Sequence, residues 1–185
     1  MNKIYYGLSG TFKATTIKTE LEKNPDVIPI WSMIKSWKYY ETEIFTDMVP
    51  RNNLNFAILH LCLLKHNIKP NLKYIIERGV SDMAFYNGVG ENDDWIRKAI
   101  IEENLITGQT EKILLVQEDR DFIENVILRE KTRREIFHNA SEFLEAQNRY
   151  LEFTIKYNDI SQIIKINNAK NYIQNLGLVY DESQK

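Results

Sequence analysis

The chain has 185 residues, of which 43% are hydrophobic and 27% are charged, and its formal net charge is −2. These values suit one globular domain with a sizeable core, and a charge this close to zero gives no general attraction to nucleic acid. The longest apolar run is far shorter than the ~20 residues that a membrane span needs, and the N-terminus has no signal-peptide pattern. We therefore expect a cytoplasmic protein that binds neither nucleic acid nor membrane.

Apolar runs that predict strands alternate with helical patterns along the whole chain. Pro29 lies inside the second run, and because proline donates no hydrogen bond to a neighbouring strand, we expect that strand to be irregular or at an edge. Strands that alternate with helices form a parallel sheet covered on both faces, so the expected fold class is α/β, a three-layer α/β/α sandwich with about five strands. Strands are predicted at residues 3–8, 27–31, 72–76, 112–117 and 162–166. Helices are predicted at residues 15–23, 32–48, 53–66, 83–86, 95–105, 121–129, 133–157 and 168–176.

A glycine-containing turn that carries a lysine follows the first strand. Gly7 and Lys13 have the separation found in the phosphate-binding signature G-x-x-x-x-G-K-[ST], in which backbone N–H groups, a helix N-terminus and the lysine bind phosphate together. Two positions depart from it, because Phe12 replaces the second glycine and Ala14 replaces the hydroxyl residue. The alternative is an ordinary strand-to-helix turn with an exposed lysine.

Glu77 and Arg78 follow the third predicted strand. In a parallel α/β sheet, ligands bind at the carboxyl ends of the strands, and the first turn is expected at the same edge. Glu77 is in a suitable place to direct magnesium, and Arg78 could clamp the acceptor. The alternative is a solvated ion pair at a strand end.

A cluster of three arginines, Arg129, Arg133 and Arg134, comes after the fourth strand and before a long helix. Arg129 and Arg133 are spaced to share one helix face, and Arg134 follows directly. A lid over a nucleotide would lie here, and its arginines could stabilise a transferred phosphoryl group. The alternative is a solvated face paired with Glu130 and Glu135.

The helix predicted at residues 53–66 is apolar around most of its circumference, which indicates burial against the sheet or a partner subunit. Cys62 lies in this helix and is expected to be buried; as the single cysteine it excludes an internal disulfide. Arg51 precedes the helix and could bind an acceptor phosphate, or it could simply be placed there without a ligand. The aromatic stretch 31–45 could stack a base, although such stretches are more often core.

Taken in order, these motifs resemble the thymidylate kinase and deoxynucleoside kinase group of P-loop kinases. The most specific part is the run from Glu77-Arg78-Gly79 through Ser81-Asp82 to Phe85. The resemblance implies one P-loop kinase-like domain over residues 1–185, a five-stranded parallel sheet and a helical lid at about residues 119–139. It also implies ATP as phosphoryl donor, Mg²⁺, nucleotide substrates in nucleotide biosynthesis, and a homodimer packed through helices like the one at residues 53–66.

The motifs and the resemblance together give a set of candidate site residues. Catalysis is assigned to Lys13, Arg78, Arg129 and Arg133. ATP binding is assigned to Gly7, Ser9, Gly10, Thr11, Phe12, Lys13, Ala14, Thr15 and Arg134. Acceptor binding is assigned to Trp31, Arg51, Arg78 and Phe85, and metal binding to Thr15 and Glu77.

The acceptor is inferred from what the second strand lacks. This strand ends without a carboxylate that could act as a general base. A hydroxyl acceptor benefits from such a base, whereas a monophosphate acceptor is already anionic and does not need one. We therefore expect a nucleoside monophosphate kinase acting on a deoxynucleoside monophosphate, dTMP in the first place, with Lys35, Lys38 or Arg51 replacing the arginine expected after that strand. One alternative is a deoxynucleoside kinase that takes its base from Glu41 or Glu43. Another is a nucleotide-binding protein of the same fold without catalysis.

Overall fold

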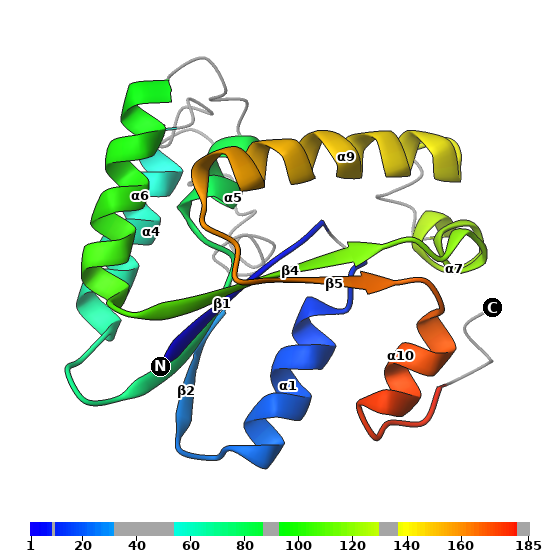
Figure 1. Cartoon of the computed structure of the whole chain (residues 1–185), viewed down its shortest axis with the longest axis horizontal. Coiled ribbons are helices and arrows are strands. Elements are labelled where there is room, and N and C mark those ends of the chain that lie inside the picture. Colours follow the sequence, from blue (N-terminus) through cyan, green and yellow to red (C-terminus); the bar gives the residue numbers. More distant parts are fainter. Residues whose placement is uncertain (9, 32–53, 87–92, 130–136, 181–185) are drawn as a thin grey trace, which may run out of the picture.

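A five-stranded parallel sheet runs through the middle of the molecule (Figure 1). The structure is a computed structural model that describes residues 1–8, 10–31, 54–86, 93–129 and 137–180. In spatial order the strands are β2-β3-β1-β4-β5, and every neighbouring pair is parallel. Their bounds are β1 Asn2–Tyr6, β2 Val27–Ile30, β3 Lys73–Glu77, β4 Thr110–Gln117 and β5 Gln162–Ile166.

Helices cover both faces of the sheet (Figure 1). One face packs against α1 and α10 through a core that includes Tyr5, Ile17 and Ile113. On the other face, Ile4 and Tyr6 belong to a core shared with α4, α7 and α9. The predicted three-layer α/β/α sandwich is confirmed. The described helices are α1 Lys13–Lys23, α4 Leu54–Asn67, α5 Val80–Tyr86, α6 Asp93–Thr107, α7 Arg120–Asn125, the 3₁₀ helix η1 Ile127–Arg129, α9 Ala140–Tyr157 and α10 Ala169–Asn175.

The register of the sheet brings two predicted site segments together. β1 lies between β3 and β4, and Tyr5 is opposite Glu77. Since the strands are parallel, the turn that follows β1 and the turn that follows β3 lie at the same edge. The edge position of β2, which carries Pro29 and pairs with β3, is also as predicted.

The helices that follow β4 differ from the prediction. The helix expected at 133–157 begins at Ala140, because Asn139 caps it: its side chain accepts a hydrogen bond from the Glu142 N–H at 3.0 Å. The helix expected at 121–129 ends at Asn125 and is followed by η1. The helix expected at 32–48 and the part of the lid at 130–136 lie outside the described residues.

Helix α4 packs against α5 and α6. Its buried positions include Ala57 and Leu64, but Ile58 and Leu59 are exposed. Cys62 is also exposed, so the prediction that it is buried was wrong; an all-round apolar pattern does not tell which face meets the core. Among the described residues, none of the helices combines the length and the apolar character needed to cross a membrane.

Candidate phosphate-binding site

The turn after β1 is built around glycine. At Gly7, φ is 145°, and a Cβ atom there would lie 2.5 Å from Thr11 Oγ1 and 2.7 Å from the Leu115 carbonyl oxygen. No larger residue fits without moving β4. Gly10 also has a positive φ, of 93°, which glycine adopts at little cost.

Lys13 is folded into this turn. Its side chain donates hydrogen bonds from Nζ to the carbonyl oxygens of Gly7, at 2.5 Å, and Leu8, at 2.6 Å. Thr11 Oγ1 lies 3.3 Å from the same nitrogen, and the residue is only 4% exposed. The alternative of an exposed lysine is therefore wrong. A cation held inside the turn, beside the N-terminus of α1, can attract a phosphate.

Phe12 takes the backbone conformation that the missing glycine would adopt easily. It caps α1 with φ 57° and ψ 17°, in the left-handed region. Its ring packs against Phe122 of α7, with centroids 4.8 Å apart, and against Tyr172 of α10, at 5.8 Å. Tyr172 also hydrogen-bonds the Thr16 hydroxyl at 2.8 Å. These contacts offset the cost of a left-handed non-glycine residue.

A buried glutamate ends β3, and a buried arginine follows it in the turn. Glu77 is 2% exposed and Arg78 is 6% exposed, so the alternative of a solvated pair is wrong. Arg78 has φ 72°, and its N–H donates to the Tyr5 carbonyl at 2.9 Å. Left-handed backbone at a non-glycine residue costs on the order of 1–3 kcal/mol and is concentrated at functional sites.

Asp82 and Tyr150 complete the site, and neither was predicted as a site residue. The Tyr150 hydroxyl accepts a hydrogen bond from the Gly7 N–H at 2.8 Å and donates to Asp82 Oδ1 at 2.7 Å. Arg78 Nη1 lies 3.4 Å from the same oxygen. Burial raises the pKa of Asp82, while the Arg78 charge, the Tyr150 hydrogen bond and the Lys13 charge act in the opposite direction. The four-residue spacing of Arg78 and Asp82 could have predicted their contact from the sequence. Tyr150 is 68 residues away from Asp82 in the sequence, and no local pattern predicts that contact.

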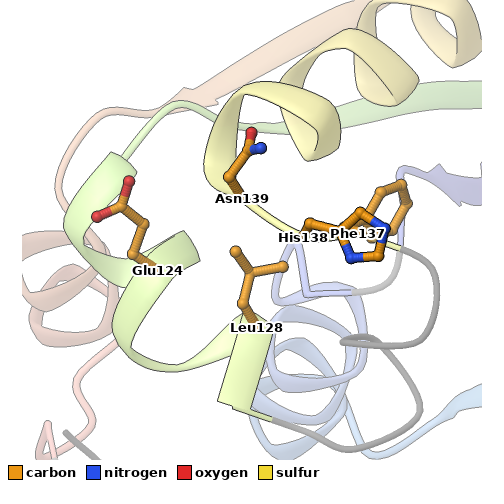
Figure 2. Close-up of a pocket in the computed structure, with 5 residues that line it drawn as sticks. All are labelled: Glu124, Leu128, Phe137, His138 and Asn139. Atoms are coloured by element: carbon orange, nitrogen blue, oxygen red, sulfur yellow. The ribbon is translucent and has the colours of Figure 1, made fainter.

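Two cavities adjoin the predicted lid. One, of about 440 Å³, lies among side chains of α7, η1 and the segment that leads into α9 (Figure 2). The other, of about 320 Å³, lies between α7 and α10, and Phe122, which contacts Phe12, is part of its wall. Asp119 borders it too, and its two carboxylate oxygens accept the N–H groups of Phe122 and Ala169. Further lining residues are Asp121, Asn125, Val126, Asn167, Asn168, Lys170 and Tyr180.

The remaining predicted site residues are scattered or undescribed. Trp31 directly follows β2 and is 36% exposed. Phe85 packs edge-on against Tyr150, with ring centroids 5.2 Å apart. Ala14 and Thr15 lie in the first turn of α1, and Arg129 ends η1. The structure does not describe Ser9, Arg51, Arg133, Arg134 or the Arg129 side chain.

Of the two residues predicted to bind metal, Thr15 and Glu77, only Glu77 brings a carboxylate to this edge of the sheet. Among the described residues, no group of three or more His, Cys, Asp or Glu side chains could hold a metal. Mg²⁺ usually keeps several waters and needs one or two carboxylates plus phosphate oxygens, and Glu77 supplies one carboxylate. Ala14 supplies no ligand, and Thr15 lies about 100° further around the helix.

No protein-family model matches the chain, and the comparison with curated proteins gives no match either. The assignment of a function therefore depends on the fold and on the geometry of the two turns.

Proposed function

We propose that the protein transfers the γ-phosphoryl group of ATP to a deoxynucleoside monophosphate, with dTMP as the preferred acceptor, in the manner of thymidylate kinases. The observation that carries the proposal is the meeting of two cationic turns on adjacent parallel strands: Lys13 in the turn after β1, and Arg78 in the turn after β3. Phosphoryl transfer depends mainly on positioning and on neutralising charge. Two fixed cations at one sheet edge suit that task.

In this proposal the donor phosphates bind over the turn from Gly7 to Lys13, at the N-terminus of α1. Glu77 would hold Mg²⁺, which supplies neutralisation of the phosphate charge when it is bound. Arg78 would face the transferred group. The lid arginines Arg129, Arg133 and Arg134 would close over it.

The donor base would occupy the cavity of about 320 Å³ between α7 and α10. Its volume is at the lower end for small-molecule sites, and Phe122 offers an aromatic side chain while Asn167 and Asn168 offer amide groups. Phe122 contacts Phe12, which directly precedes Lys13. The cavity is therefore close to the phosphate turn.

The absence of an acid at the end of β2 favours a monophosphate acceptor. Val27–Ile30 and Trp31 include no carboxylate, and an anionic phosphate oxygen needs no general base. The test is a coupled ADP-release assay with Mg²⁺ over the four deoxynucleoside monophosphates and the four deoxynucleosides. We expect turnover with dTMP. No turnover of any monophosphate by folded protein would overturn the proposal, and turnover of thymidine but not dTMP would select the deoxynucleoside kinase.

Nucleotide binding without catalysis is the second candidate, and Phe12 and Ala14 favour it. Titration calorimetry with ATP, with and without Mg²⁺, separates the two, because binding without turnover selects this candidate. Absence of ATP binding under both conditions would contradict the kinase and would leave a non-catalytic protein of the same fold that does not take ATP.

A lysine variant tests the phosphate turn directly. Lys13→Ala removes the cation that bonds the Gly7 and Leu8 carbonyls, and we expect turnover to fall at least about a hundredfold. Lys18→Ala, on the same helix, is the control and should keep its activity. Circular dichroism should show the same fold in both variants, and a Lys13→Ala variant as active as the control would contradict the assigned role.

We also propose a cytoplasmic homodimer that packs through α4. Ile58, Leu59 and Cys62 are exposed on this helix, and a second copy would cover them. Sedimentation analysis tests this, with Leu59→Glu expected to shift the protein to monomer. An unchanged sedimentation coefficient would contradict the assignment.

A further inference from the structure

A buried chain of hydrogen bonds joins the two cationic turns through α9. We propose that Tyr150 and Asp82 are positioning residues, which hold the phosphate turn and Arg78 at a fixed separation. The kinetic part of this inference rests on the proposed function; the structural part stands without it. Helix α9 lies on the face of the sheet that also carries α5 (Figure 1), and α5 and α9 are in contact.

The chain begins at the first residue of the turn and ends at the second cation. The Gly7 N–H donates to the Tyr150 hydroxyl at 2.8 Å, and that hydroxyl donates to Asp82 Oδ1 at 2.7 Å. Arg78 Nη1 is 3.4 Å from Oδ1, and the Gly79 N–H donates to Oδ2 at 3.1 Å. One hydroxyl and one carboxylate therefore link both turns.

The tyrosine hydroxyl has a role that packing alone does not explain. A phenylalanine would keep the edge-on contact with Phe85 and would spare the cost of burying a hydroxyl. The hydroxyl is used as acceptor and donor at once, and Tyr150 and Asp82 are both 0% exposed. Removing the hydroxyl would leave the buried Gly7 N–H without this acceptor. Losing one partner of a buried hydrogen bond costs more free energy than replacing both partners by apolar groups.

The backbone is restricted at both ends of this chain of hydrogen bonds, at Gly7 and at Arg78. Gly7 has no room for a Cβ, its carbonyl accepts from Lys13, and Arg78 has φ 72°. A displacement of Gly7 would therefore move the oxygen to which Lys13 is bonded. Misplacement of groups by about 1 Å can cost a hundredfold in rate, so a device that fixes these groups acts on catalysis without touching substrate.

The test uses two tyrosines of the same helix. Tyr150→Phe removes the linking hydroxyl. Tyr157→Phe is the matched control, since its hydroxyl also donates to an aspartate, Asp93 Oδ1, at 2.8 Å. With the acceptor that the wild type turns over best, we expect Tyr150→Phe to lower kcat on the order of tenfold to a hundredfold, with KM changed far less. The control should keep wild-type kcat within about twofold, and equal kcat in both variants would overturn the inference.

Two readouts do not need turnover. Amide hydrogen exchange at Gly7 should be slow in wild type and in Tyr157→Phe, and faster in Tyr150→Phe. Inorganic tripolyphosphate, titrated by calorimetry, should bind more weakly to Tyr150→Phe than to the control. If wild type turns over no acceptor, the proposed function fails, and hydrogen exchange at Gly7 still decides the structural part of the inference. A fast-exchanging Gly7 amide in wild type would overturn it with no variant at all.

A second variant covers the case in which Tyr150→Phe does not fold. Asp82→Asn keeps the side-chain volume and an oxygen for the Tyr150 hydroxyl, but removes the charge that faces Arg78. We expect the same loss of kcat with little change in KM. Asp82→Asn with wild-type kcat and wild-type tripolyphosphate affinity would contradict the positioning role.

Discussion

Two aspartates of this chain have the same kinds of partner in opposite surroundings. Asp82 faces Arg78, four residues before it, and Tyr150 of α9. Asp93 faces an arginine four residues after it, at 2.7 Å, and Tyr157 of the same α9, at 2.8 Å. Asp82 is 0% exposed, whereas the Asp93 side chain is 45% exposed.

The difference in burial changes the chemistry of the two carboxyl groups. Burial raises the pKa of Asp82. The pKa of Asp93 is lowered well below its usual value by hydrogen bonds from Lys156, Arg97 and Tyr157, with almost no burial to oppose them. The exposed cluster around Asp93 links α6 to the C-terminal end of α9 through Lys156 and Tyr157. The buried cluster around Asp82 lies between the two cationic turns. An aspartate with an arginine and a tyrosine thus forms a surface contact in one place and part of a candidate site in the other.

The largest expected effect that tests this comparison comes from removing each carboxylate. Asp82→Ala would remove the carboxylate that faces the buried Arg78 guanidinium. Removing one partner of a buried ion pair costs about 3–5 kcal/mol of stability. Asp93→Ala should change the free energy of unfolding far less, because exposed pairs contribute little. Urea denaturation of both variants measures the difference. Equal losses would mean that burial does not separate the two clusters.

A smaller effect is expected at Gly7, the glycine at which the buried chain of hydrogen bonds begins. Gly7→Ala would place a Cβ 2.7 Å from the Leu115 carbonyl oxygen, and this overpacking should cost about 1–3 kcal/mol in addition to backbone strain. Gly177→Ala is the matched control, because it also has a positive φ, of 84°, but nothing lies within 4 Å. It should lose only about 1–2 kcal/mol from strain. A thermal melt in which both variants lose the same stability would show that the turn adapts.

The smallest expected effect is a pH dependence at Asp93. Its folded-state pKa is depressed, so its contribution to stability is present above the unfolded pKa of about 3.9 and is lost as pH falls toward the folded value. The Tm of wild type should exceed that of Asp93→Asn at pH 7 by no more than a few degrees. The gap should shrink by pH 3, and a gap that widens on acidification would contradict the assigned direction.

Local patterns were sufficient to predict the sheet and the first turn. The apolar runs identified the strands, and the spacing of Gly7 and Lys13 identified the turn that the structure closes around Lys13. Contacts between distant segments could not be predicted. Tyr150 meets Asp82 across 68 residues of sequence, and no periodicity indicates such a pair. Asn139 was a local signal that the helical pattern concealed, since its cap starts α9 later than the pattern suggested.

The aromatic contact between α1 and α10 has a consequence for the order in which the protein is made. Phe12 and Thr16 lie near the beginning of the chain, and their partner Tyr172 lies near its end, as the neighbouring blue and red helices of Figure 1 show. Synthesis on the ribosome proceeds from the N-terminus, so α1 is translated long before α10. A nascent chain that stops before residue 172 lacks the Tyr172 ring that packs against Phe12, so the turn after β1 reaches its final surroundings only after α10 has been translated.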